Sequence, residues 1–244
     1  MTRRRERSMK LLIVIPAYNE ADNIERVITE LQQYSYDYII VNDGSADKTA
    51  EICRKNGYHL LDLPVNLGLT GAVQAGMKYA FQNGYDCAVQ LDGDGQHDPA
   101  YLAKMMEQMR DHGDDIVIGS RFVTEKKPSS LRMMGSNLIQ FAIRLTTGKN
   151  IQDPTSGLRL YNRQMLGEFV RDFNLTPEPD TLCYLMRCGA EVSEIQVEMR
   201  ERIAGESYLN LTRSIQYMLR MGLSILLIQW FRDRKPIRKE VSAK

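Results

Sequence analysis

A short apolar run leads into an acidic, glycine-rich turn at residues 88–99, which read Ala88-Val89-Gln90-Leu91-Asp92-Gly93-Asp94-Gly95-Gln96-His97-Asp98-Pro99. The apolar residues predict a buried strand, and the two glycines allow the backbone to turn where a side chain would obstruct it. Asp92, Asp94 and Gln96 place oxygen ligands at every second position of the turn. Hard divalent cations such as Mg²⁺ and Mn²⁺ prefer ligands of this kind. The stretch therefore favours a metal site that directly follows a buried strand.

Other interpretations of this turn have to be weighed. An isolated Asp-Gly pair is most often a simple turn. An EF-hand calcium loop beginning at Asp92 would need glycine at position 97 and glutamate at position 103, where the chain has His97 and Ala103. A phosphatase with an aspartyl nucleophile would carry it near the start of the fold, with a small hydroxyl residue where Gln96 stands. The metal interpretation therefore depends on the neighbouring motifs.

The chain alternates apolar strands with helices. The expected strands are 11–15, 38–41, 60–63, 88–91, 115–121 and a half-buried strand at 195–199; the expected helices are 24–31, 48–55 and 131–147. This order predicts an α/β fold with a mostly parallel sheet flanked by helices. Ligands of such sheets bind beyond the carboxyl ends of the strands, so the polar clusters 16–20, 43–47 and 92–96 are expected to meet at one edge. Asn19 is expected to cap the first helix.

The segment Asn66-Leu67-Gly68-Leu69-Thr70-Gly71 opens another helix. Two interpretations stay open, a flexible loop before a helix and a group of backbone N–H groups that face an anion. The segment lacks the Lys-Ser/Thr of a P-loop and the glycine spacing of a dinucleotide-binding fold.

Composition limits the class of protein. The chain has 244 residues, enough for one large α/β domain, and a net charge of +1, which gives no argument for nucleic acid as a partner. The four cysteines have no zinc-binding spacing, which fits a reduced, cytosolic compartment. The basic N-terminal arm, residues 1–8, is interpreted as a solvated arm, with attraction to anionic lipid as the alternative.

Several motifs together resemble the family-2 inverting glycosyltransferases of the GT-A fold. They are Ile15-Pro16-Ala17-Tyr18-Asn19-Glu20, Val41-Asn42-Asp43-Gly44-Ser45-Ala46-Asp47, Asn66-x-Gly68, Leu91-Asp92-Gly93-Asp94-Gly95-Gln96-His97, Asp98-Pro99 and Gly119-Ser120-Arg121. The resemblance covers about residues 9–208. Within the family the chain is most similar to dolichyl-phosphate and polyprenyl-phosphate sugar (mannose) synthases.

The resemblance implies a role for each matching residue. The positions implied to bind the nucleotide sugar are Pro16, Ala17, Tyr18, Glu20, Asp43, Gly71 and Asp92. Asp92, Asp94 and Gln96 match the positions around Mg²⁺ or Mn²⁺. A cation there would also offset the repulsion between these carboxylates and a pyrophosphate and would stabilise the leaving group.

On the acceptor side the resemblance implies catalytic roles for Arg121, Arg132, Asp153 and Arg202, with Asp153 as the candidate base, and contacts to the acceptor phosphate from Arg132, Ser136 and Arg202. Arg132 could instead be a solvated helix residue, and Asp153 before Pro154 a turn former. The segment around Arg202 departs from the family pattern, because Glu201 replaces an aspartate and Tyr208 stands where a lysine is frequent.

The C-terminal part, residues 209–232, predicts an amphipathic helix, followed by a charged tail at 233–244. Its most apolar stretch, Met221 to Phe231, is far shorter than the ~20 residues of a membrane span. It is expected to pack on its own domain, to bind a partner copy, or to lie in a membrane interface with Trp230 and the flanking basic residues at the headgroups.

The favoured hypothesis is metal-dependent transfer of a hexose from GDP-mannose or UDP-glucose type donors to a polyprenyl phosphate, on the cytoplasmic face of a membrane. A membrane protein or a second copy is a possible partner. Two alternatives are a glycosyltransferase with a saccharide hydroxyl acceptor and a non-catalytic sensor or scaffold.

Overall fold

The computed structural model describes residues 9–93, 95–128, 131–200, 211–228, 231–232 and 236–237. Arg202 and the other residues of the 201–210 segment, as well as Asp94 and Trp230, lie outside this set, as do the N-terminal arm and most of the charged tail.

Within the described residues a seven-stranded sheet forms the centre of the molecule, in the order β3-β2-β1-β4-β6-β5-β7. The strands are β1 (Leu11–Ala17), β2 (Asp37–Asn42), β3 (Leu60–Asp62), β4 (Cys87–Gln90), β5 (Ile116–Ser120), β6 (Arg159–Asn162) and β7 (Val192–Gln196). Only β6 is antiparallel to its neighbours β4 and β5. The expected mostly parallel α/β sheet is therefore confirmed.

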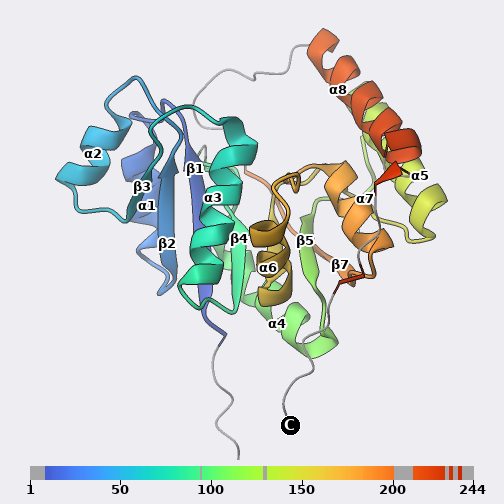
Figure 1. Cartoon of the computed structure of the whole chain (residues 1–244), viewed down its shortest axis with the longest axis horizontal. Helices are drawn as coiled ribbons and strands as arrows, with labels where there is room; N and C mark the ends of the chain where they lie inside the picture. Colours follow the sequence, from blue (N-terminus) through green and yellow to red (C-terminus); the bar gives the residue numbers. More distant parts are fainter. Residues whose placement is uncertain are drawn as a thin grey trace, which may run out of the picture.

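Helices cover both faces of this sheet (Figure 1). They are α1 (Ile24–Leu31), α2 (Thr49–Lys55), α3 (Gly68–Gln82), η1 (Pro99–Tyr101), α4 (Leu102–His112), α5 (Leu131–Thr147), α6 (Arg163–Arg171), α7 (Pro179–Arg187), α8 (Leu211–Leu223) and the π-helical turn η2 (Ser224–Ile228). A buried apolar cluster lies on each face of the sheet. The helices α1, α2 and α4 contribute to one cluster, and α3, α5, α6, α7 and α8 to the other.

The first strand shows why the sequence forms a sheet with two covered faces. Leu11, Ile13 and Ile15 belong to one buried cluster, whereas Leu12 and Val14 belong to the other. Because successive side chains of a strand point to opposite faces, a continuous apolar run suits a strand covered on both sides. The four cysteines are free and buried, and burial raises the pKa of the Cys87 thiol to about 12.

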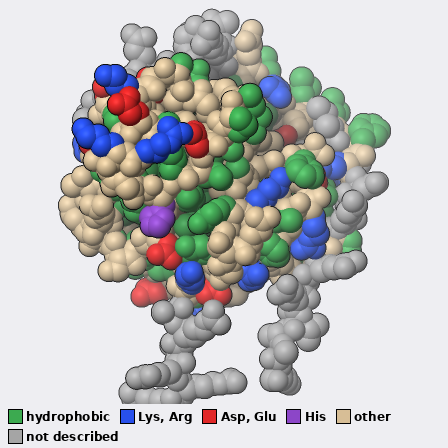
Figure 2. All heavy atoms as spheres, turned by 60° about the vertical axis from the view of Figure 1, so that its left-hand side comes forward, with side chains coloured by type: hydrophobic (Ala, Val, Ile, Leu, Met, Phe, Trp, Pro, Cys, Tyr) green, Lys and Arg blue, Asp and Glu red, His purple; other side chains and the backbone are tan. Residues whose placement is uncertain are grey.

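The carboxyl ends of β1, β2, β4, β5 and β7 lie at the same edge of the sheet, because these strands run in the same direction. The antiparallel strand β6 starts there, so the segment that precedes it also reaches this edge. We call this edge the site rim. Figure 2 shows acidic and basic side chains interspersed on one face of the molecule, which agrees with the small net charge.

Two local predictions differ from the structure. Asn19 does not cap α1, which begins at Ile24 after Asn23; Asn19 has a φ of 56° and belongs to the preceding turn. The predicted strand at 195–199 is shifted, since β7 ends at Gln196 and Met199 instead forms an isolated antiparallel bridge with His97. The alternation of apolar residues continues past the end of the strand because this segment pairs with the turn after β4.

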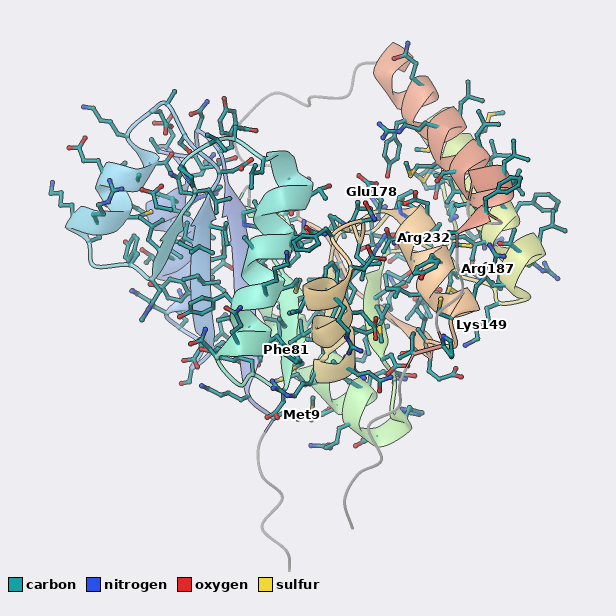
Figure 3. All side chains as sticks on the ribbon, viewed as in Figure 1. Met9, Phe81, Lys149, Glu178, Arg187 and Arg232 are labelled. Atoms are coloured by element: carbon teal, nitrogen blue, oxygen red, sulfur yellow. The ribbon has the colours of Figure 1, made fainter. Side chains whose placement is uncertain are left out.

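The C-terminal helix packs on its own domain through one face. Met221 and Ile225 are buried, and α8 lies beside α5 (Figure 1). Gly135 permits this close approach, because a Cβ there would lie 2.4 Å from Met218 Cγ. Arg232 lies against α7 (Figure 3): it pairs with Asp172 at 2.7 Å and covers the ring of Tyr184. Among the described residues, no helix combines the length and apolar character needed to cross a membrane.

Candidate active site at the carboxyl edge of the sheet

The loops after β1 and β2 are joined by hydrogen bonds. Asn19 Oδ1 accepts from the backbone N–H of Ala46 at 2.9 Å, and Asn19 N–H donates to Ser45 Oγ at 2.9 Å. The Glu20 N–H donates to Thr49 Oγ1 at 2.9 Å, and the Ala21 N–H to Asp47 Oδ2 at 3.1 Å. The two loops predicted to bind the nucleotide sugar therefore form one unit.

Asp43 ties this unit to the start of α3. Its side chain is buried, and Oδ1 accepts from the Leu67 N–H at 2.7 Å. A Cβ on Gly44 would lie 2.7 Å from the backbone nitrogen of Asn66, so the two loops pass close to each other. Gly71 has a similar steric role, since a Cβ there would lie 2.3 Å from Leu67 Cβ.

The turn after β4 meets the loop after β1. A Cβ on Gly93 would lie 3.5 Å from the Pro16 carbonyl oxygen and 3.7 Å from Glu20 Cγ. Tyr18 is exposed nearby in the chain, directly after Ala17 at the end of β1. Of the predicted nucleotide-sugar residues, Pro16, Glu20 and the Asp92 turn are thus brought together.

Asp92 is held by residues that the sequence did not single out. Its Oδ1 accepts from Gln90 Nε2 at 2.7 Å, and its backbone N–H donates to Nδ1 of the buried His97 at 3.2 Å. The other ring nitrogen, Nε2, lies 3.9 Å from Asp92 Oδ2. A Cβ on Gly157 would lie 3.5 Å from the same oxygen, so the segment before β6 borders Asp92.

The donor set suits a hard divalent cation. The Asp92 side chain is 37% exposed, and its Oδ2 lies 3.9 Å from His97 Nε2. Within the described part of the chain, no three His, Cys, Asp or Glu side chains are clustered to hold a metal ion. Asp94 lies outside that part, so of the three predicted ligands the structure describes Asp92 and Gln96. Carboxylate and carboxamide oxygens at alternate positions match the preference of Mg²⁺ and Mn²⁺.

Arg121 and Asp153 form a bidentate ion pair on the other side of the rim. Arg121 Nε donates to Asp153 Oδ2 at 2.7 Å and Nη2 to Oδ1 at 2.9 Å. Asp153 Oδ2 also accepts from the backbone N–H of Arg121, and Oδ1 from the Thr155 hydroxyl, each at 3.2 Å. Asp153 is 0% exposed. Its carboxylate is therefore turned to Arg121 and away from solvent.

Glu194 on β7 fixes the backbone that carries Asp153. Its carboxylate accepts from the backbone N–H groups of Gln152, at 2.6 Å, and Asp153, at 2.8 Å. Burial raises the pKa of Glu194, and these hydrogen bonds offset only part of that shift. Gln196 holds the Arg121 carbonyl oxygen at 3.0 Å.

Arg159, the first residue of β6, fixes the segment that carries Asp153. It is 2% exposed and donates to the carbonyl oxygens of Pro154, at 2.6 Å, and Ser156, at 2.9 Å. Ser156 Oγ in turn donates to the Gly119 carbonyl oxygen at 2.6 Å. Buried hydrogen bonds thus fix the segment before β6, for which the sequence alone also allowed a simple turn at Asp153 and Pro154.

The remaining predicted acceptor residues divide into described and undescribed positions. Arg132 lies in the first turn of α5, but its side chain is outside the described set, and so is Arg202. Ser136 is fully buried and accepts from Lys127 Nζ at 3.4 Å. The Arg200 N–H donates to the Gln96 carbonyl oxygen at 3.0 Å, so the chain leading to Arg202 starts beside the predicted metal turn.

The sequence did not predict five residues that build the rim, namely Gln90, His97, Lys127, Arg159 and Glu194. Gln90 offered a signal, because a polar side chain inside an apolar strand needs a hydrogen-bonding partner. Lys127 offered none, since charged turns are common and its partners lie on the following helix.

Glucosyl-3-phosphoglycerate synthase from Mycobacterium tuberculosis, solved with Mn²⁺ and UDP-glucose, superposes with a TM-score of 0.62 over 91% of this chain and 79% of that one, at 17% sequence identity. The fold is therefore the expected GT-A fold of glycosyltransferases.

The sequence comparisons identify the family. Residues 12–169 match the Glycosyl transferase family 2 domain. An undecaprenyl-phosphate mannosyltransferase of Micrococcus luteus is 30% identical over 217 residues, which cover 83% of this chain and 88% of that protein. A UDP-N-acetylglucosamine–dolichyl-phosphate N-acetylglucosaminyltransferase of Methanococcus voltae is 32% identical over 64% of this chain and 70% of that protein. The chain belongs to glycosyl transferase family 2 and is a glycosyltransferase.

Proposed function

We propose that this glycosyltransferase moves a hexose from a nucleotide sugar to a polyprenyl phosphate, with inversion at the anomeric carbon. The relatives from Micrococcus luteus and Methanococcus voltae carry names that specify polyprenyl-phosphate and dolichyl-phosphate acceptors. The observation that carries the proposal is the Arg121–Asp153 pair, in which the candidate base is buried and both carboxylate oxygens are occupied.

The choice of acceptor follows from proton chemistry. A sugar hydroxyl is a weak nucleophile at neutral pH and needs a positioned base. A phosphate monoester has its second pKa near ~6, so it is already largely dianionic at pH 7 and needs cations rather than a base. A carboxylate that is committed to an arginine serves the second reaction better than the first. The arrangement therefore favours a phosphate acceptor over a saccharide hydroxyl.

The donor is proposed to bind across the joined loops after β1 and β2 and the turn after β4. Pro16, Ala17, Tyr18, Glu20 and Asp43 would hold the nucleoside, with Gly71 in the first turn of α3. Asp92, Asp94 and Gln96 would hold Mg²⁺ or Mn²⁺, which as a Lewis acid stabilises the leaving nucleoside diphosphate. Arg121, Arg132 and Arg202 would position the acceptor phosphate oxygen for attack on the anomeric carbon. Arg132 and Arg202 would do so through the fork of a guanidinium group, whereas Arg121, whose Nε and Nη2 are bound to Asp153, would contribute mainly its charge.

A lipid-linked acceptor requires contact with a bilayer, and the two neighbouring helices α5 and α8 offer an exposed apolar surface. We call it the apolar helix face; it consists of Met134, Leu138, Phe141 and Leu145 of α5, Leu219 and Leu223 of α8, and Leu227 of the adjoining turn η2. The spacing of three or four residues places each set along one side of its helix. Exposed Arg144 and Arg220 lie on the same two helices and suit anionic headgroups. We propose that this face binds the cytoplasmic leaflet peripherally, while Arg232 holds the helix to its own domain.

The test is turnover with a panel of GDP- and UDP-sugars and undecaprenyl or dolichyl phosphate in detergent, with Mn²⁺. A polyprenyl phosphate glycoside of inverted anomeric configuration, together with the nucleoside diphosphate, is expected from one donor. Free polyprenol and a saccharide are the control acceptors, because both offer a hydroxyl group; they are tested with the same donors at the same concentrations. Transfer to the saccharide but not to the phosphate would overturn the proposed acceptor, and nucleotide-sugar binding without any turnover would favour a sensor.

A further inference from the structure

Lys127 lies in the connection between β5 and α5, six residues after Arg121. Its Nζ donates to three oxygens of α5: Gln140 Oε1 at 2.8 Å, Asn137 Oδ1 at 3.1 Å and Ser136 Oγ at 3.4 Å. All three acceptors are neutral. The ammonium group is thus held in place by hydrogen bonds, while its charge is not matched by these partners.

The nearby carboxylates are already committed elsewhere. Asp153 is bound by Arg121, and Glu194 accepts two backbone N–H groups. Among the described residues, no carboxylate forms a salt bridge with Lys127. Burial lowers the pKa of Lys127, whereas the more distant Asp153 and Glu194 raise it and Arg121 lowers it. A half-buried cation of this kind is stabilised by an anion that enters the site.

The same contacts change the expected role of Ser136. This serine is 0% exposed, and the amine of Lys127 lies on its hydroxyl. An acceptor phosphate that approaches from solvent would meet Lys127 before Ser136. Lys127 and Arg121 also flank one aromatic ring, with Nζ 5.7 Å and Cζ 5.1 Å from the ring centre of Phe122. The two cations therefore lie around the same ring on the acceptor side of the rim and interact electrostatically.

We propose that the ammonium group of Lys127 binds the phosphate of the acceptor and that Ser136, Asn137 and Gln140 position this lysine. The inference rests on the proposed polyprenyl-phosphate acceptor. Lys127 neutralises charge next to the Arg121 guanidinium, which reduces the repulsion between the acceptor phosphate and the phosphates of the donor. Ser136 then acts through the lysine and does not contact the phosphate itself.

The experiment compares Lys127→Ala, Lys127→Arg and Ser136→Ala with the wild type, with farnesyl phosphate as a water-soluble acceptor. Lys126→Ala is the matched control, because Lys126 is adjacent and exposed. Lys127→Ala is expected to raise the acceptor KM about 10-fold or more, the scale of a lost hydrogen bond to a charged group, with the donor KM unchanged. Lys127→Arg should restore most of the affinity, and Ser136→Ala and Lys126→Ala should have smaller effects than Lys127→Ala.

The pH dependence separates charge from simple anchoring of the loop. A lysine is charged only below its pKa, so a lowered pKa means that the charge of Lys127 is lost at lower pH than for an ordinary lysine. The acceptor KM of the wild type should therefore rise on the alkaline side. In Lys127→Arg this rise should move to higher pH, because arginine stays protonated. If Lys127 only anchored the loop, the rise in acceptor KM would occur at the same alkaline pH in Lys127→Arg as in the wild type.

The outcomes distinguish this inference from the proposed function. Transfer to farnesyl phosphate by the wild type, with an unchanged acceptor KM in Lys127→Ala, overturns the role of Lys127 and leaves the function standing. A larger loss in Ser136→Ala than in Lys127→Ala assigns the phosphate contact to the serine and also overturns it. Absence of transfer to any isoprenyl phosphate by the wild type, together with transfer to a saccharide, removes the proposed acceptor and the role of Lys127 with it.

Discussion

The two halves of the site rim are built by different interactions. On the donor side, around β1, β2 and β4, side-chain oxygens accept hydrogen bonds from backbone N–H groups of a neighbouring loop, as Asn19, Asp43 and Asp47 do. On the acceptor side, around β5, β6 and β7, Glu194 also accepts from backbone N–H groups, but arginines are added: Arg121 pairs with Asp153, and Arg159 donates to carbonyl oxygens.

This difference matches the charges that each half has to handle. Loops that are linked through their backbone N–H groups would hold a nucleoside in a fixed shape, with Asn19, Asp43 and Asp47 as the acceptors. Binding a phosphate next to a pyrophosphate requires cations, and those cations need carboxylates to fix their orientation without neutralising all of them. We propose from this difference that Asp153 positions Arg121, and variants in either half test this role.

The largest effect is expected from the donor side. Asp94→Ala should lower turnover about 10³-fold, because the leaving diphosphate loses electrostatic stabilisation. Nucleotide binding should lose its dependence on Mg²⁺ or Mn²⁺, which calorimetry measures, while circular dichroism stays unchanged. Asp111→Ala, an exposed carboxylate on α4, is the control. Full activity of Asp94→Ala with either metal would remove the metal hypothesis.

On the acceptor side, Arg132→Ala and Arg202→Ala should each lose at least ~10²-fold in turnover, the scale for a lost positioning contact. Asp153→Asn should lose less, about 10-fold, because Arg121 keeps one acceptor but loses its fixed orientation. Rates are measured with saturating donor across a pH series, with thermal unfolding to check folding of the buried variant. If Asp153→Asn suffers most and recovers at high pH, Asp153 acts as a base and the acceptor is a hydroxyl.

The apolar helix face should give a smaller effect, confined to membranes. Phe141→Ser combined with Leu223→Ser is expected to weaken binding to anionic liposomes about 10-fold or more, given the ~1.5–3 kcal/mol for burying one large apolar side chain. Donor binding should not change. Phe173→Ser is the control, since this exposed aromatic residue lies outside α5 and α8. Unchanged liposome binding with loss of a dimer in sedimentation would instead assign the face to a second copy.

The fold and the donor side could be predicted from the sequence to a large extent. Apolar runs such as residues 11–15 identify buried parallel strands, here β1, which continues to Ala17. The polar clusters that follow such strands meet at the rim because parallel strands end at one edge. Local periodicity also predicted α5 with the correct bounds. These features depend on residues that are close in the chain.

The acceptor side could not be predicted in the same way, because its contacts join residues far apart in the chain. Arg121 pairs with Asp153 across 32 positions, and Glu194 supports the backbone of Asp153 from 41 positions away. No rule based on the spacing of residues in the sequence predicts such pairs. The prediction that Asn19 caps the first helix was wrong for a related reason. The asparagine side chain fits both a helix cap and a turn, and the partner that decides between them, Ala46, is on another loop.

The last prediction uses Asn19 to measure how strongly the two donor loops are coupled. Asn19 has a positive φ of 56°, where asparagine is tolerated and alanine costs about 1–2 kcal/mol. Asn19→Gly keeps the backbone conformation accessible but removes the acceptor for the Ala46 N–H, whereas Asn19→Ala loses both. The donor KM is therefore expected to rise about 2-fold in Asn19→Gly and several-fold more in Asn19→Ala, since ~1.4 kcal/mol corresponds to tenfold. Acceptor KM should stay constant in both variants. Equal effects of glycine and alanine would mean that backbone strain plays no part, and a normal donor KM in both would mean that the two loops hold the nucleotide independently.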